Sequence, residues 1–211
     1  MIITFLDGSK KEFEVGSSAL DIANSISSSL AKKSVYALVN GEAFDLTRPI
    51  LTDATLELKM KEDAIDVLNH SCAHLLASAI KKLYPNAMFG VGPSIEEGFY
   101  YDVNLGDVKI TEADLPKIEK EMKHIASQNV KFERKEVSKQ EALEVFKGDK
   151  YKVEIINELE DDAVITTYTN GTYTDLCRGP HVLSTILLKN FKLLSVAGAY
   201  WRGDSNNEQL Q

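Results

Sequence analysis

Alternating apolar and polar residues, interrupted by one helical segment, fill the first sixty positions of the chain. The alternation predicts short strands over residues 2–6, 11–15, 36–39 and 54–60. Asp7-Gly8 between the first two strands is typical of a tight hairpin turn. Apolar residues recur at helical spacing over residues 19–30, and a serine at position 17 or 18 can cap that helix. A hairpin, a helix and further strands in this order indicate a small β-grasp (ubiquitin-like) domain at residues 1–62.

The longest helical pattern covers residues 63–83. Asp63 is suited to cap its N-terminus, and Pro85 ends it because proline cannot continue a helix. Its apolar stripe consists of Ile65, Leu68, Cys72, Leu75, Ala79 and Leu83. His70 and His74 lie off this stripe and, being four residues apart, project from the same side of the helix. We expect this helix to organise the second domain and to present two imidazoles together.

The rest of the chain alternates helices with strands. Apolar periodicity predicts helices over residues 111–129, 138–147 and 149–159 and strands over residues 132–137, 165–176 and 191–197. Asn170-Gly171 divides residues 165–176 into a hairpin. Helices mixed with antiparallel hairpins predict a larger α+β domain at residues 63–211, with an antiparallel sheet and a central helix.

Composition narrows the class of protein. The chain has 211 residues, of which 44% are hydrophobic and 27% are charged, as in ordinary globular proteins. Its net charge of −8 argues against a protein that coats long nucleic acid, although it permits a local grip on a few nucleotides. The N-terminus has no signal-peptide pattern, and no apolar run reaches membrane length. With only two cysteines, Cys72 and Cys177, a disulfide framework is not indicated, so we expect a cytoplasmic protein.

Four metal-ligating side chains recur in two pairs with the same spacing. His70 and His74 form one pair on the long helix, and Cys177 and His181 form the other after the predicted hairpin. Three imidazoles and a thiolate can bind Zn²⁺ tetrahedrally, and four protein ligands usually make a closed structural site. The same groups can instead form a metal-free pocket in which histidine exchanges protons near neutral pH. The spacing alone leaves both interpretations open, and it is also compatible with a coincidental arrangement of the four residues.

Other polar residues have weaker local signals. Asp175 precedes Cys177 by two residues on a strand, so both side chains point to one face, where a carboxylate could orient a histidine or bind an ammonium group. Tyr100 and Tyr101 are adjacent, so only one of them can face a pocket. The local pattern around Lys152 indicates nothing beyond a solvated lysine, and an ordinary surface position is likewise the simpler interpretation of Asp175.

Four blocks of sequence resemble one family in order and content. They are HSCAHLL at residues 70–76, GFYYD at 98–102, DLCRGPH at 175–181 and GAYWRGD at 198–204. Together they resemble bacterial-type threonyl-tRNA synthetase, and residues 1–62 are similar to its N-terminal TGS domain. The spacing of histidine and cysteine alone is also found in the editing domain of alanyl-tRNA synthetase. The other blocks favour the threonyl enzyme.

The resemblance implies an N-terminal fragment made of a TGS domain and an editing domain. The class II catalytic core and the anticodon-binding domain would follow beyond Gln211, so ATP, zinc and homodimerisation would belong to that core. The implied activity is hydrolysis of serine wrongly attached to the 3′ end of tRNA for threonine, without a membrane partner. A second site is needed because one methyl group discriminates serine from threonine by only about 1–3 kcal/mol.

The resemblance also implies a set of site residues. The catalytic group would be His70, Lys152, His74, Cys177 and His181, and the substrate-binding residues would be Tyr101 and Asp175. His70 and Lys152 would handle the water and the ester, Asp175 would take the ammonium of serine, and no metal would be required. The alternatives are a zinc-dependent alanyl-type trans-editing hydrolase, with Zn²⁺ on the three histidines and the cysteine, and a non-catalytic module that docks tRNA or protein.

Overall fold

The computed structural model describes residues 1–211 and divides into two compact units. One consists of Met1–Leu68 with Gly179–Leu183, and the other consists of Asn69–Arg178 with Ser184–Gln211. Both mix helices with strands that are mostly antiparallel, which confirms the predicted α+β class. None of the helices is long and apolar enough to cross a lipid bilayer. The domain boundary after residue 62 stays a prediction.

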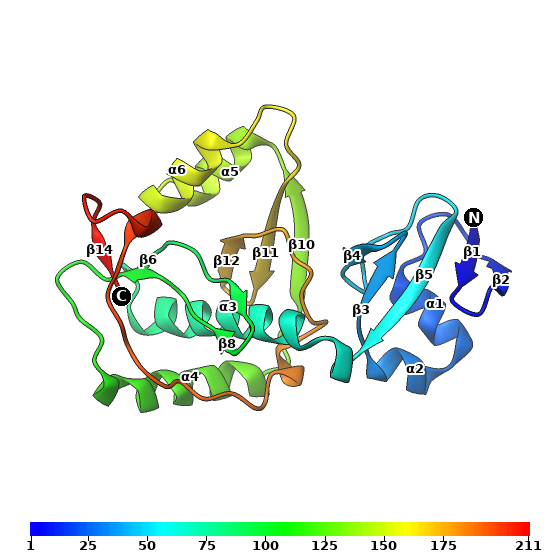
Figure 1. Cartoon of the computed structure of the whole chain (residues 1–211), viewed down its shortest axis with the longest axis horizontal. Helices are drawn as coiled ribbons and strands as arrows, with labels where there is room; N and C mark the ends of the chain where they lie inside the picture. Colours follow the sequence, from blue (N-terminus) through cyan, green and yellow to red (C-terminus); the bar gives the residue numbers. More distant parts are fainter. The chain divides into compact units, whose positions relative to one another are not determined.

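The smaller unit is built on one five-stranded sheet (Figure 1). Its strands are β1 (Ile2–Phe5), β2 (Lys10–Glu12), β3 (Ser34–Val39), β4 (Glu42–Phe44) and β5 (Ala54–Met60), in the order β2-β1-β5-β3-β4. The strands β1 and β5 are parallel, and the other pairs are antiparallel. Apolar residues of the sheet and of α1 (Ala19–Ile26), including the fully buried Ile3 and Ile22, form its core. This arrangement confirms the predicted β-grasp fold.

The helix predicted over residues 19–30 is in fact two helices. The first helix, α1, begins after Ser18, whose hydroxyl accepts a hydrogen bond from the Asp21 N–H in a capping box. It ends at Ile26, and α2 (Ser28–Lys33) follows. Between them Ser27 is extended, and its hydroxyl accepts from two N–H groups at the start of α2. The spacing of apolar residues does not reveal this break, because the break depends on a polar residue. Serine competes for backbone hydrogen bonds and favours helix ends.

The larger unit combines helices with a three-stranded antiparallel sheet. The sheet contains β10 (Phe132–Val137), β11 (Ile165–Asn170) and β12 (Tyr173–Leu176), in that order. Its helices are α3 (Ile65–Leu83), α4 (Leu115–Ser127), α5 (Lys139–Phe146) and α6 (Lys150–Glu158). The part of α3 that begins at Asn69 belongs to this unit. Short strands complete it, namely β6 (Met88–Phe89), β7 (Ser94–Ile95), β8 (Gly98–Phe99), β9 (Val103–Asn104), β13 (Ala199–Tyr200) and β14 (Gln209–Leu210). The hairpin predicted at Asn170-Gly171 is confirmed, and α5 and α6 pack against each other (Figure 1).

The long helix α3 is buried along most of its length rather than on one stripe. Between Ser71 and Ile80 every side chain is buried, because small and apolar residues occur on all its faces. The predicted cap is wrong. Asp63 lies in the 3-10 turn η1 (Lys61–Asp63), and the carbonyl of Ala64 accepts the first hydrogen bond of the helix, from Leu68.

The strand predicted over residues 191–197 is also wrong. This segment pairs with no strand, and Leu194 is 82% exposed. It is attached instead to α4, where the buried carboxylate of Glu119 accepts hydrogen bonds from the Leu193 N–H and the Lys192 ammonium. β-branched and aromatic content predicts a strand only where a neighbouring strand is available for pairing, and none is available here.

Candidate functional site

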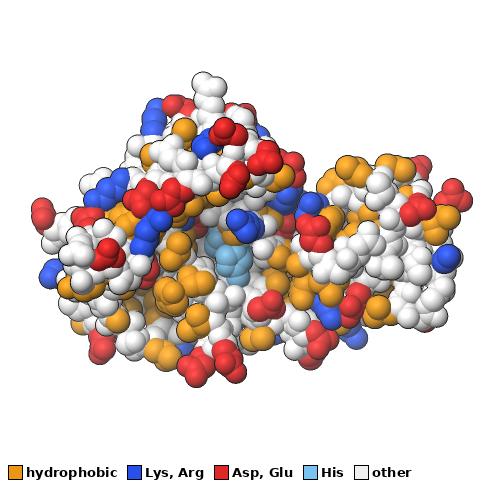
Figure 2. All heavy atoms as spheres, turned by 45° about the horizontal axis from the view of Figure 1, so that its top comes forward, with side chains coloured by type: hydrophobic (Ala, Val, Ile, Leu, Met, Phe, Trp, Pro, Cys, Tyr) orange, Lys and Arg blue, Asp and Glu red, His pale blue; other side chains and the backbone are white.

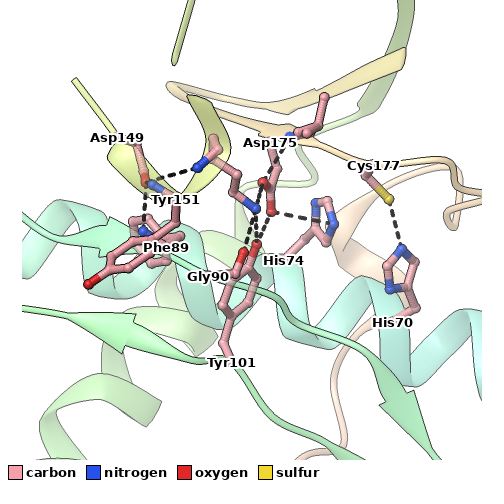
Figure 3. A network of polar contacts seen from close by, with 11 residues as sticks. His70, His74, Phe89, Gly90, Tyr101, Asp149, Tyr151, Asp175 and Cys177 are labelled. Carbon is pink, nitrogen blue, oxygen red and sulfur yellow. Dashed lines mark hydrogen bonds and ion pairs between the residues drawn. The ribbon is translucent and has the colours of Figure 1, made fainter. Parts of the chain in front are cut away.

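A pocket of about 340 Å³ in the larger unit collects most of the predicted site residues (Figure 3). His70 and His74 come from α3, Tyr101 from the connection between β8 and β9, and Lys152 from α6. The end of β12 supplies Asp175 and Cys177, and Arg178 follows them in the lining. In the space-filling view, histidine atoms are visible in a hollow with basic side chains beside them (Figure 2).

A buried carboxylate forms the centre of the pocket. Asp175 is 1% exposed, and one of its oxygens lies 2.7 Å from the ammonium of Lys152, which is 3% exposed. The other oxygen accepts a short hydrogen bond from the hydroxyl of Tyr101. The Lys152 ammonium also donates to that hydroxyl at 3.0 Å and to the carbonyl of Gly90 at 2.9 Å. Since an unpaired buried charge is very unfavourable, these contacts make a mutually dependent group.

The N-terminus of α6 determines where Lys152 lies. Asp149 caps this helix, because its carboxylate accepts hydrogen bonds from the N–H groups of Tyr151 and Lys152. Its second oxygen accepts from the N–H of Phe89 at 2.6 Å. One carboxylate thus joins the start of α6 to β6, directly beside the Gly90 carbonyl that receives the Lys152 ammonium (Figure 3).

The two histidines of α3 have different surroundings. His74 is 2% exposed, and its Nε2 lies 3.7 Å from an Asp175 oxygen. Burial, and then electrostatic repulsion from His70 and Lys152, hold the pKa of His74 well below its ordinary value, so the ring is neutral at pH 7. His70 is partly exposed, and its Nε2 lies 2.9 Å from the sulfur of Cys177. The two rings meet edge to face at 5.0 Å.

Backbone pairing positions Cys177. The Cys177 N–H donates to the carbonyl of Thr166 on β11, and the Thr166 hydroxyl donates back to the carbonyl of Cys177 by a short hydrogen bond. Because Thr166 is itself buried and paired in the sheet, this reciprocal contact continues the hairpin past Leu176. The thiol is thereby held beside His70 at the end of the strand.

The fourth predicted ligand, His181, is buried in the segment Gly179–Leu183. Its backbone N–H donates to the carboxylate of Asp45 at 2.8 Å. Within the larger unit, one ligand atom from each of His70, His74 and Cys177 lies within 4.8 Å of the others, so these three residues could contribute to a metal site. Imidazole and thiol ligands fit Zn²⁺.

Tyr101 in the pocket and the buried Tyr173 both stay protonated. Burial, and then the Asp175 carboxylate, raise the pKa of Tyr101 well above its ordinary value. Burial likewise raises the pKa of Tyr173, whose ring packs against Phe89. As expected from their adjacency, Tyr101 is buried in the pocket while Tyr100 is 44% exposed. The phenol of Tyr101 is therefore a hydrogen-bond donor beside a charged pair.

Local pattern alone misjudged or missed several of these residues. Lys152 and Asp175 are buried, not solvated, and only the family resemblance placed them in a pocket. Asp149 and Thr166 received no role. The signal for Asp149 was present, since an aspartate at the start of a predicted helix is suited to be its N-cap. The hydroxyl of Thr166 and the carbonyl of Gly90 had no signal, because their partners are distant in the sequence.

Comparisons with known proteins agree on the family. Residues 1–60 match the TGS domain, and residues 165–211 match the threonyl and alanyl tRNA synthetase second additional domain. Threonine–tRNA ligases of Staphylococcus aureus strains RF122 and JH9 are each 54% identical over 211 residues, or 99% of this chain. The chain spans 33% of the length of these relatives. It corresponds to the N-terminal region of bacterial-type threonyl-tRNA synthetase, with a TGS domain followed by an editing domain.

Proposed function

We propose that this chain hydrolyses the ester of tRNA for threonine that carries serine. The observation that carries the proposal is the pocket in which His70 and Cys177 stand beside the buried Lys152–Asp175 pair. An ester hydrolase needs an ordered water, a group that accepts its proton and a cationic or hydrogen-bonding group near the developing oxyanion. The match of residues 165–211 to the second additional domain supports the same assignment.

The reaction begins with attack of water on the ester carbonyl carbon. His70 is the proposed proton acceptor, because it is partly exposed to the pocket while His74 is buried and neutral. The Lys152 ammonium lies in the same pocket, and its positive charge is suited to stabilise the tetrahedral oxyanion. The Tyr101 hydroxyl and the Gly90 carbonyl hold this ammonium in place. When the carbon–oxygen bond of the ester breaks, the ribose hydroxyl leaves with a proton and serine is released. Cys177 and His74 shape the pocket and position the water.

Asp175 has a double role in this proposal. Both of its oxygens already have partners, since one contacts the Lys152 ammonium and the Leu176 N–H, and the other contacts the Tyr101 hydroxyl. The carboxylate therefore orients the two donors of the pocket. The ammonium of serine would share this same carboxylate, which fixes the substrate amine close to Lys152. Selectivity against threonine follows from size, because a pocket fitted to serine excludes the additional methyl group.

The test is deacylation of tRNA for threonine charged with serine, with threonine-charged tRNA and mischarged tRNA for alanine alongside. We expect the serine ester alone to be hydrolysed above its spontaneous rate. His70→Ala removes the proposed base and should lower kcat by about 10²–10⁴-fold. His124→Ala is the matched control, because this exposed histidine on α4 contacts only the Gln128 side chain and its own helix. An unchanged rate for His70→Ala would overturn the mechanism.

The role of Lys152 is tested with a double variant. Replacing Lys152 alone would leave the Asp175 carboxylate buried without its counterion and would lower the free energy of unfolding by about 3–5 kcal/mol. Lys152→Met combined with Asp175→Asn removes both charges and keeps the volume of the site. We expect this double variant to fold, by thermal unfolding, and to lose deacylation activity. A folded double variant with wild-type activity would show that the pair only stabilises the fold.

We further propose that the reaction needs no metal, although His70, His74 and Cys177 could contribute ligands to one. The support is that His70 and Cys177 already contact each other and that the Lys152 ammonium supplies a positive charge in the pocket. Protein treated with a chelator should keep its activity, with zinc absent by elemental analysis. Loss of activity with zinc, and recovery when zinc is returned, would favour the alanyl-type metal-dependent hydrolase.

A further inference from the structure

Two basic side chains line the pocket, and only one of them is explained by the proposed chemistry. Lys152 is buried and is paired with Asp175. Arg178 is exposed, follows Cys177 directly in the chain, and lines the same pocket. No protein group forms a hydrogen bond or an ion pair with its guanidinium. A permanent positive charge therefore stands beside the reacting groups without a protein counterion.

We propose that Arg178 binds the phosphodiester of the terminal nucleotide that carries the ester. This inference rests on the proposed function and assigns a substrate contact to a residue outside the set of reacting groups. A terminal ribose carries the aminoacyl ester on a ring hydroxyl and its phosphodiester on C5′. When the ester enters the pocket, the phosphate must therefore follow at its mouth.

The position of Arg178 matches this requirement. Its neighbour Cys177 contacts His70 at 2.9 Å, and the Cα atoms of Cys177 and Arg178 are about 3.8 Å apart, as in any consecutive pair. The guanidinium is charged at all accessible pH values and presents a planar fork that matches two phosphate oxygens. It is also weakly hydrated compared with an ammonium group, so transferring it to a phosphate costs less.

The electrostatics of the pocket favour an anionic ligand at this point. Asp175 is the one carboxylate of the lining, and it is buried and engaged with Lys152 and Tyr101. It is therefore not available to pair with Arg178. The chain as a whole carries a net charge of −8, which repels an RNA backbone at long range. The exposed cation of Arg178 in the pocket lining offsets this repulsion where the backbone must approach.

The experiment compares a substrate that contains the phosphodiester with one that lacks it. One is tRNA for threonine charged with serine, and the other is seryl-adenosine, which carries the same ester and has no phosphodiester. Arg178→Ala should raise KM for the charged tRNA about tenfold, with kcat little changed, and should leave kcat/KM for seryl-adenosine unaltered. Arg178→Lys should recover part of the loss, since lysine keeps the charge without the fork. Arg134→Ala removes an arginine from the sheet that does not line the pocket and serves as the control.

The outcomes separate this inference from the proposed function. If wild-type protein hydrolyses neither substrate, the proposed function itself fails. If both substrates are hydrolysed and Arg178→Ala weakens both equally, the residue acts through the pocket and not through the phosphate. If the variant is indistinguishable from wild type on charged tRNA, Arg178 is an ordinary solvated side chain. Either of the last two results overturns the inference.

Discussion

Lys152 and Asp175 are charged residues with almost no exposure to water. Removing two charges from solvent has an effective cost of several kcal/mol per ion, and well-packed apolar residues often replace such pairs without loss of stability. A buried pair of this kind therefore contributes little to the stability of the fold, and its presence indicates a functional site. Here the pair is bonded to Tyr101 and to the Gly90 carbonyl, so its geometry is fixed before a substrate arrives.

Cys72 gives a pH prediction at the same scale. Burial raises the pKa of its thiol from 9.0 to about 12. The unfolded thiol releases its proton from about pH 9, while the folded one keeps it, so the folded state binds more protons in this range. Its contribution to stability is complete below pH 9 and decreases between pH 9 and 12, at up to about 1.4 kcal/mol per pH unit.

Urea denaturation of wild type and Cys72→Ala at pH 8, 9 and 10 checks this prediction. The variant should lose stability less steeply between pH 9 and 10 than wild type. The tyrosines Tyr101 and Tyr173, whose pKa values are also raised, affect both proteins equally and cancel in the difference. Parallel curves for the two proteins would show that the Cys72 thiol is not the titrating group.

Among the elements, α6 matters most for the site, because its N-terminus determines the position of Lys152. The Asp149 carboxylate caps α6 and bonds to β6 through Phe89, and Lys152 lies three residues later. Asp149→Ala removes both contacts. We expect kcat for deacylation to fall about tenfold or more, because small displacements of a catalytic group cost large factors in rate. Stability should fall by about 1–2 kcal/mol from the lost cap and the lost hydrogen bond.

Two further variants distinguish positioning from simple loss of stability. Ser138→Ala removes the capping box of α5, a helix outside the pocket, at a similar cost in stability. It should unfold at a comparably lower urea concentration and keep full activity. Asp149→Asn keeps an acceptor for the helix cap and should recover part of kcat. Equal loss of activity in the Ser138 and Asp149→Ala variants would contradict a positioning role.

The elements also show how far the sequence determines the structure. Strands β5 and β10 were predicted with their observed ends, because alternation and flanking turns are local signals. The break at Ser27 and the unpaired segment 191–197 were missed, because a helix boundary depends on one hydroxyl and a strand depends on a distant partner. In the site, the spacing of His70 and His74 was readable, whereas the contact between Lys152 and Asp175 joins elements 23 positions apart by residue number.

At the scale of the whole molecule, charge limits how the chain can hold RNA. A protein with a net charge of −8 gains little from counterion release along a duplex. The proposed contact is confined to the single-stranded 3′ end, where recognition uses stacking and the ribose 2′-hydroxyl more than phosphate neutralisation. This predicts weak binding of tRNA and a modest dependence of activity on salt.

The dependence of kcat/KM on salt concentration measures this directly. For one or two phosphate contacts on a single strand, the logarithmic slope should be about −0.7 to −1.4, since each contact contributes roughly −0.7. Arg178→Ala should make the slope shallower by roughly 0.7, and Arg134→Ala, outside the pocket, should leave it unchanged. A wild-type slope of about −5 or steeper would mean that the chain engages the acceptor duplex over many phosphates. In that case the chain, despite its net negative charge, would have to bind RNA through a basic surface larger than the mouth of the pocket.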